Sequence, residues 1–266
     1  MTTTLRKWKA VFGIFFQDGL AYRASGLIWV VTDLITAVTM PLVWAAASGT
    51  GTIGGFAAAD FVLYYVAFFV IGSFVTSHIM WELSMEIKES QFTVYLLRPM
   101  SFYGYTFLRN LSWRILRTTY TLPFLAVLLI GYRSYLASAQ VNFGWEFWAA
   151  LVCGHLVSIT FVLMMSMLAL FTEEAQSIFE LYYVPHMFLS GYLFPISLLP
   201  EWAQKVTNFF PFYYTTGAPT EILVGRVAGS DALRVIGIQL IWIVGAFLAA
   251  QVLWKRGLRH YSGVGM

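Results

Sequence analysis

Six long apolar blocks dominate this sequence and constrain its fold more than any other feature. Each approaches the roughly 20 residues that a helix needs to cross a hydrocarbon layer about 30 Å thick. Hydrophobic residues make up 59% of the chain and charged residues 11%, against roughly 45–50% and about 25% in soluble domains. The sequence therefore predicts an all-α, polytopic membrane protein with six transmembrane helices. The predicted spans are 27–47, 61–81, 111–132, 147–171, a fifth that begins at 172, and 235–254.

The basic residues predict which side of the membrane each connection faces. The N-terminal segment, the 82–117 connection and the C-terminal tail hold 12 of the 16 Lys and Arg residues. The opposite loops, 48–60 and 133–146, contribute only Arg133. Under the positive-inside rule, the three basic segments are cytoplasmic. With six crossings, both termini of this multi-pass protein of the cell (plasma) membrane are therefore expected in the cytoplasm.

Residues 1–26 predict an amphipathic helix that lies in the membrane interface. Apolar residues recur at three- and four-residue spacing from Leu5 to Phe15, which places them on one helical face. The basic residues from Arg6 to Lys9 lie elsewhere and reach lipid headgroups in this interpretation. The remaining residues, 27–266, form the six-helix membrane domain.

The segment 185–226 combines prolines with aromatic residues and does not fit a simple span or loop. It holds five of the eight prolines, too many for one unbroken helix. It is also too apolar for an ordinary solvated loop. We expect short helices that dip part-way into the outer leaflet and pack against the bundle, with a re-entrant segment over 195–226.

The sequence offers little catalytic chemistry. None of the five lysines follows a glycine, so the chain lacks the usual loop that cradles nucleotide phosphates. The single cysteine, Cys153, excludes an internal disulfide and a cysteine metal site. His155 and His186 are expected as interior histidines. A net charge of +3 spread along the chain does not indicate nucleic-acid binding. We therefore expect a protein that is not an enzyme and binds no metal.

Two acidic residues within predicted spans allow two interpretations. Asp33 and Glu180 each lie about two turns into a span, where ionisable groups are costly and often functional. They could line a path for a cationic or polar substrate. Alternatively, each pairs with an Arg or Tyr near the interface and holds two helices together.

The cytoplasmic connection 82–117 carries the strongest functional signal. Residues Glu86 to Leu97 predict a short helix with a charged face and an apolar face, and the following Arg98-Pro99 ends it. A short exposed helix between two spans serves as a docking element as readily as a structural one.

Three stretches resemble the six-span permease subunit of ABC-2 type transporters, a likeness that covers nearly the whole chain. The first is Leu-Leu-Arg-Pro-Met-Ser at 96–101, after the second span. The second is Ser-Gly-Tyr-Leu-Phe-Pro-Ile-Ser-Leu-Leu-Pro at 190–200, before the last span. The third is the basic tail Trp-Lys-Arg-Gly-Leu-Arg-His-Tyr at 254–261.

This resemblance implies a division of labour between chains. A second copy or a homologous permease completes the translocation path, and a separate cytoplasmic ABC ATPase subunit binds ATP and Mg²⁺. Export is the usual direction in the family. The residues expected to couple to the ATPase are Glu86, Lys88, Phe92, Leu96, Leu97, Arg98 and Pro99. The residues expected at an extracellular gate are Phe194, Pro195, Pro200, Phe210 and Pro211.

Two other classes of protein compete with this interpretation. An ion-coupled secondary transporter would use Asp33 or Glu180 as its coupling group, but the inverted repeats typical of such proteins are absent, because the proline-rich segment occurs once. An integral-membrane enzyme acting on lipid would need a polar catalytic cluster at one membrane face, which the sequence does not contain.

Overall fold

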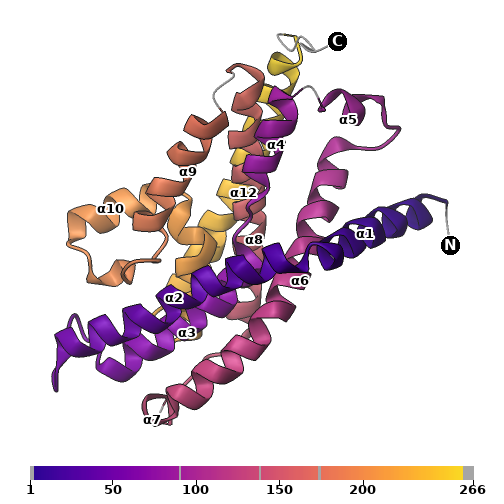
Figure 1. The fold of residues 1–266 in the computed structure, drawn as a ribbon. Helices are drawn as coiled ribbons and strands as arrows, with labels where there is room; N and C mark the ends of the chain where they lie inside the picture. The colour runs from indigo at the N-terminus through magenta and orange to yellow at the C-terminus, as the bar shows by residue number, and fades with distance from the viewer. Residues whose placement is uncertain (1–2, 90, 138, 173–174, 260–266) are drawn as a thin grey trace.

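The computed structural model describes residues 3–89, 91–137, 139–172 and 175–259. Within these ranges the chain is helical, with loops and one isolated bridge between Ile53 and Phe56 (Figure 1). In chain order the elements are α1 (Thr3–Ala21), α2 (Arg23–Ser48), α3 (Ala58–Val75), α4 (Ile79–Lys88), α5 (Thr93–Leu97), α6 (Phe102–Gly131), α7 (Arg133–Leu136), α8 (Trp145–Ser166), the 3₁₀ turn η1 (Met167–Leu170), α9 (Ala175–Leu189), the 3₁₀ turn η2 (Ile196–Leu198), α10 (Glu201–Phe209), the π-helix η3 (Tyr213–Gly217), α11 (Ala218–Leu223) and α12 (Ser230–Gly257).

Local side-chain and backbone chemistry explains where several of these helices begin. The Ser101 hydroxyl accepts a hydrogen bond from the Gly104 amide at 3.4 Å and caps α6. The Asp60 carboxylate accepts one from the Ala57 amide at 2.8 Å at the start of α3. Gly229, with φ of +58°, precedes α12 in a backbone conformation that favours glycine.

Five helical segments are long and apolar enough to cross a membrane. They are α2, α3 together with α4, α6, α8 together with η1, and α12. They correspond to five of the six predicted spans. The predicted span that begins at 172 corresponds to α9, whose 15 described residues rise only about 22 Å. Glu173 and Glu174, the acidic residues expected in its first turn, lie outside the described residues. The crossing at α9 stays a prediction.

Large apolar side chains are exposed along α2, α6 and α12. Ile28 on α2, Ile130 on α6 and Ile241 on α12 are 66%, 71% and 71% exposed. Such wide apolar faces are unfavourable in water, whereas lipid solvates them. The exposed faces and the five apolar helices identify a multi-pass membrane protein.

The second predicted span is not continuous, in contrast to the prediction of one helix over 61–81. α3 ends at Val75, Thr76 is extended with φ of −72° and ψ of 113°, and α4 begins at Ile79. The break persists because neighbouring helices satisfy its backbone. The Arg114 guanidinium donates to the Thr76 carbonyl, and the Ser77 amide donates to the Ser158 hydroxyl at 2.8 Å. Irregular backbone is tolerated inside a membrane only with such internal partners or beside a cavity.

The prediction of a single helix over Glu86–Leu97 is also wrong. α4 ends at Lys88 and α5 begins at Thr93. The Phe92 amide donates to the Glu86 carbonyl at 3.0 Å, which closes a turn between the two helices. The Phe92 side chain thereby enters the core and is 0% exposed. Burial of this ring therefore outweighs the helical propensity of the segment.

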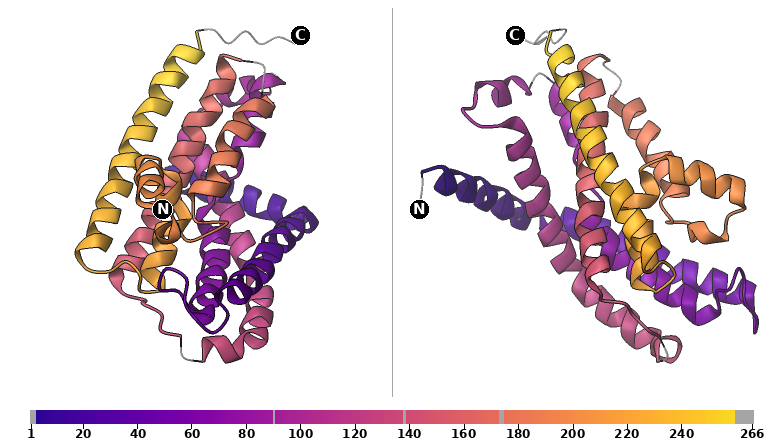
Figure 2. Two further views of the ribbon diagram at one scale, coloured as in Figure 1. Left: turned by 90° about the vertical axis from the view of Figure 1, so that its left-hand side faces the viewer. Right: turned by 180° about the vertical axis from the view of Figure 1, so that it is seen from behind.

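Helix α1 lies across α6, away from the axis of α8 and α12 (Figures 1 and 2). The Phe15 ring packs edge-on against Tyr105, with centroids 4.9 Å apart. Trp8 packs over Gly104, where a Cβ atom would lie 2.8 Å from the indole. The apolar face predicted to meet lipid therefore makes contacts with α6, while Arg6 and Lys7 are exposed.

The proline-rich segment folds into short helices, as predicted. η3 and α11 are buried against α3, α8 and α12, whereas α10 projects from the bundle (Figure 1). Two glycines allow this packing. Gly191 has φ of +90°, and a Cβ atom there would lie 2.4 Å from the Tyr64 hydroxyl. A Cβ atom on Gly217 would lie 2.4 Å from the Ser190 carbonyl oxygen.

Candidate functional site

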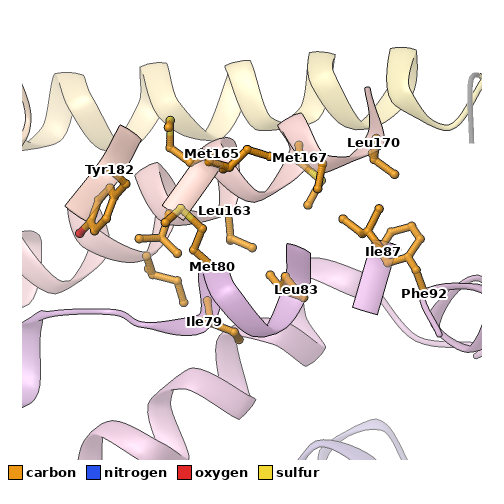
Figure 3. Close-up of a cluster of buried hydrophobic side chains, with 14 of the residues drawn as sticks. Ile79, Met80, Leu83, Ile87, Phe92, Leu163, Met165, Met167, Leu170 and Tyr182 are labelled. Atoms are coloured by element: carbon orange, nitrogen blue, oxygen red, sulfur yellow. The ribbon is translucent and has the colours of Figure 1, made fainter. Parts of the chain in front are cut away.

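The largest buried apolar cluster supports the connection between α4 and α6 (Figure 3). It joins Leu83 and Ile87 of α4 to Leu163 of α8 and Met167 of η1, and Phe92 extends it beyond α4. All five of these residues are at most 4% exposed. The connection therefore packs against the end of α8 and against η1 and is not a loose loop.

Arg109 of α6 ties this connection to α4 by two ion pairs. Its guanidinium lies 2.8 Å from a carboxylate oxygen of Glu82 and 2.8 Å from one of Glu86. The two glutamates are four residues apart on α4, where like charges repel. Arg109 neutralises that repulsion and fixes α4 against α6.

Tyr95 of α5 completes this polar network. Its hydroxyl donates to a Glu86 carboxylate oxygen at 2.9 Å and accepts from Arg109 at 3.0 Å. Burial raises the pKa of Tyr95 well above the usual phenol value, so the hydroxyl stays protonated at neutral pH. The network therefore positions α5 as well as α4.

An aromatic stack attaches the same connection to the end of α12. The Phe92 ring lies 5.5 Å from Phe102 and 5.2 Å from Trp254, and the Phe102 and Trp254 rings stack at 4.5 Å. These rings link α5, the start of α6 and the end of α12. Displacement of α5 would consequently act on two candidate spans at once.

The remaining residues predicted to couple to an ATPase lie outside this core. Leu96 and Leu97 are 43% and 80% exposed. Lys88, Arg98 and Pro99 are also exposed, and the Arg98 guanidinium lies 4.8 Å from the centre of the Tyr105 ring. The structure thus separates Phe92, which is internal, from an exposed apolar and basic tip at the end of α5.

Asp33 forms an ion pair with Arg117 of α6, as one of its two interpretations proposed. The Arg117 side chain is 3% exposed and that of Asp33 is 31% exposed. Both residues line a small cavity of about 60 Å³. Glu180 of α9 is exposed and does not line this cavity. The structure therefore places Asp33, and not Glu180, at this cavity.

A larger cavity of about 640 Å³ lies between α1, α2, α4, α6 and α9. Trp29, Trp81 and Trp113 form part of its wall. Arg117 and His78 line both this cavity and the smaller one. His78 belongs to the break between α3 and α4, so the interrupted span borders both spaces.

The five predicted gate residues share the proline-rich segment but differ in burial. Pro195 and Pro211 are buried, whereas Pro200 and Phe210 are exposed and Phe194 is half-buried. Pro200 immediately precedes α10. Two tyrosines of α3 anchor the start of this segment. The Tyr64 hydroxyl donates a hydrogen bond to the Gly191 carbonyl at 3.0 Å, and the Tyr65 hydroxyl donates one to the Leu193 carbonyl at 2.7 Å.

The histidines lie in the interior, as predicted. His155 and His186 are 3% and 7% exposed, and a ring nitrogen of His155 lies 3.3 Å from the Val75 carbonyl oxygen. Among the described residues, no three His, Cys, Asp or Glu side chains gather where they could hold a metal ion.

Comparison with known proteins identifies the class of this bundle. The sequence pattern of the ABC-2 family transporter proteins matches residues 27–265. The chain belongs to the ABC-2 transporter family. A run of 76 residues is also 29% identical to nodulation protein J of Sinorhizobium fredii. That run covers 29% of this chain and 29% of the relative. A permease of the ABC-2 family is a membrane transport subunit and is not itself catalytic.

Sequence reasoning missed Arg109 and Trp254 as residues that organise the ABC-2 permease connection. Glu82 and Glu86 occur four residues apart, a spacing that places both on one face wherever the segment is helical and favours a cation beside them. Nothing in the linear pattern selects Arg109 over the other arginines. The contact between Trp254 and Phe92 joins residues far apart in the chain and leaves no local signal.

Proposed function

We propose that this chain is the permease subunit of an ATP-driven exporter. It crosses the membrane six times with both termini in the cytoplasm and pairs with a second copy or a homologous permease. A separate cytoplasmic ABC ATPase subunit, which binds ATP and Mg²⁺, docks on each permease. Membership of the ABC-2 family and the basic residues at the α4–α6 end support this arrangement.

One observation carries the proposal: the tip of α5 is exposed and apolar, yet rigidly supported. Leu97 is 80% exposed, while Phe92, five residues earlier, is fully buried. Because this exposed apolar tip belongs to a firmly packed element, a contact with another protein explains it better than a role as a solvated loop. Leu96, Leu97 and Arg98 form the surface that we assign to the ATPase.

Force applied at this tip has a direct route into the bundle. The network of Arg109, Glu86 and Tyr95 links α5 to α4 and α6. The stack of Phe92 and Trp254 links it to α12. α4 begins at the break, which borders both cavities. Movement of the ATPases would therefore rock the bundle around the break in the second span.

At the other end of the bundle, we assign the gate to the proline-rich segment. The segment is a chain of short helices, which its prolines keep from forming one continuous helix. The residues that we assign to the gate are Phe194, Pro195, Pro200, Phe210 and Pro211. The tyrosines of α3 that hold Gly191 and Leu193 connect this gate to the second span.

The experiment that tests the function is affinity purification of the tagged full-length chain from its native membrane in mild detergent. We expect an ABC ATPase subunit to co-purify, alone or with a second permease, and the isolated chain to hydrolyse no ATP. Recovery of the chain without any ATPase in several mild detergents would contradict the proposal. Ion-coupled transport through Asp33 would then be the function to test.

A further inference from the structure

The 640 Å³ cavity is lined by three arginines of α6 that differ in their charge partners. Arg109 is paired with two glutamates of α4, and Arg117 is paired with Asp33. Arg114 has no carboxylate within ion-pair distance in the described part of the chain. Arg114 is also the most deeply buried of the three, at 0% exposed.

Several buried hydrogen-bond donors around Arg114 have no partner. Nη1 of Arg114 donates to the Thr76 carbonyl. Its Nε and Nη2 atoms have no hydrogen-bond partner among the described residues, and the same holds for Nε of Arg117 and Nδ2 of Asn110. Asn110, Arg114 and Arg117 are three and four residues apart, so they share one face of α6. All three line the cavity.

An arginine without a counter-charge within a candidate span is costly, and such residues often mark a ligand or ion path. Guanidinium groups recognise phosphate and carboxylate through paired, charge-assisted hydrogen bonds. The unpartnered Nε and Nη2 atoms of Arg114 form one edge of its guanidinium plane, the edge that a bidentate anion uses. Because both atoms have almost no accessible surface, the side chain must turn toward the cavity to reach an anion. The acidic residues of the wall, Asp18 and Glu82, are exposed, and Glu82 is held by Arg109.

The remainder of the wall suits an apolar or aromatic group. Trp29, Trp81 and Trp113 line the cavity, together with Phe15 and Phe179. The Trp29 ring stacks on His78 with centroids 6.0 Å apart. A volume of about 640 Å³ lies within the ~300–1,000 Å³ typical of sites for small organic ligands.

We infer that this cavity binds the anionic group, a phosphate or carboxylate, of an amphipathic molecule. Arg114 makes the principal contact with the anion, and Asn110 donates a further hydrogen bond. The tryptophans hold the apolar part. Describing the ligand as cargo rests on the proposed transport function, whereas the binding site does not depend on it.

The test measures binding to the purified full-length chain in phosphatidylcholine nanodiscs. The probe is 12-bromododecyl phosphate, whose bromine quenches tryptophan fluorescence when it enters the cavity. The control probe, 12-bromododecyl trimethylammonium, has the same tail and the opposite charge. We expect saturable quenching by the phosphate probe and none by the ammonium probe. Equal quenching by both probes would overturn the inference.

Two pairs of measurements isolate the anion contact. Arg114→Gln is expected to raise the Kd of the phosphate probe about tenfold or more, since it removes a charge-assisted hydrogen bond. Its thermal stability without ligand is measured alongside, because the change also removes the hydrogen bond to the Thr76 carbonyl. Ser25 lines the cavity and is exposed, so Ser25→Glu adds a negative charge without disturbing packing. Ser25→Glu should weaken binding, and the isosteric Ser25→Gln should not.

Unchanged binding of the phosphate probe in both Arg114→Gln and Ser25→Glu would overturn the proposed site. If Arg114→Gln does not fold, unchanged binding in Ser25→Glu alone would overturn it. If inorganic phosphate displaces the probe as effectively as an unbrominated alkyl phosphate does, the site binds a free anion, and the inference of an amphipathic ligand is overturned. Competition by phosphatidylglycerol placed in the nanodisc would identify a membrane lipid as the source. If phosphatidylglycerol does not compete while the phosphate probe still binds, the natural ligand is a non-lipid amphiphile. Because no ATPase takes part, failure here is distinct from failure of the proposed function.

Discussion

Phe92 and Leu97 lie five residues apart on the connection between α4 and α6, yet Phe92 is fully buried and Leu97 is 80% exposed. Phe92 packs against Phe102 and Trp254 and so fixes α5 to the bundle. Leu97 stands at the end of α5 with little protein around it. One residue therefore holds the segment in place, and the other is available to a partner.

Leu97→Asp should abolish ATPase association without unfolding the permease. The change places a charge at an exposed apolar contact, where it would be desolvated in the complex. Co-purification of the ATPase should be lost, while the thermal unfolding temperature in detergent should stay the same. Retention of the ATPase at the level of the unchanged protein would remove Leu97 from the docking surface.

Phe92→Ala is the matched variant inside the bundle and should act in the opposite way. Removal of a buried phenylalanine ring costs about 3–5 kcal/mol, and the lost contacts include Phe102 and Trp254. The unfolding temperature should therefore fall clearly below that of Leu97→Asp. Equal stability of the two variants would contradict the anchoring role of Phe92.

Arg109→Gln should destabilise the α4–α6 contact. The substitution leaves Glu82 and Glu86 four residues apart without a cation, and a lost partner of this kind costs about 1–3 kcal/mol. We expect a lower unfolding temperature in detergent. Lys205→Gln removes an exposed positive charge on α10 and serves as the control, which should unfold like the unchanged protein.

Asp33→Asn should destabilise the protein because it leaves the buried Arg117 without a counter-charge. We expect a cost of about 2–3 kcal/mol, below that of a fully buried pair. The double variant Asp33→Asn with Arg117→Gln should recover much of this loss, which a double-mutant cycle of thermal unfolding measures. Additive effects would show that the ion pair is not coupled. Transport that fails in Asp33→Asn and is not restored in a stable double variant would favour ion coupling through Asp33.

Gly154→Ala should destabilise the packing of α8 on η3. A Cβ atom at Gly154 would lie 2.4 Å from the Thr215 carbonyl oxygen, and such overpacking costs about 1–3 kcal/mol. Gly245 on α12 has no heavy atom within 4 Å of its Cβ position. Gly245→Ala should therefore be neutral or stabilising by up to about 1 kcal/mol. If both variants unfold at the same temperature, the close approach of α8 to η3 has no energetic consequence.

Much of this architecture was predictable because a membrane imposes a length and a polarity on each crossing. The apolar blocks identified α2, α6, α8 and α12, and the proline content of 185–226 identified a set of short helices. The ABC-2 resemblance was confirmed over residues 27–265. Leu97 is exposed, and its predicted contact with an ATPase stays a prediction.

The interruptions and the pairings were not predictable from local pattern. The break at Thr76 exists because Arg114 of α6 and Ser158 of α8 satisfy the freed backbone, and both lie far away in the sequence. The pairing of Asp33 with Arg117 likewise requires α2 and α6 to be neighbours. For Asp33, the residues alone left two interpretations open.

Composition and hydrophobic length determined that this chain is a helical membrane protein, because each crossing must satisfy its own backbone and expose apolar side chains to lipid. Tertiary structure decided which charges are paired and which are left over. Arg109, Arg114 and Arg117 share a stretch of nine residues on α6. Only the helices packed around them give two of them carboxylates and leave the third without one, buried in the wall of a cavity. Electrostatic partners are set by distances between segments, which the order of residues does not contain.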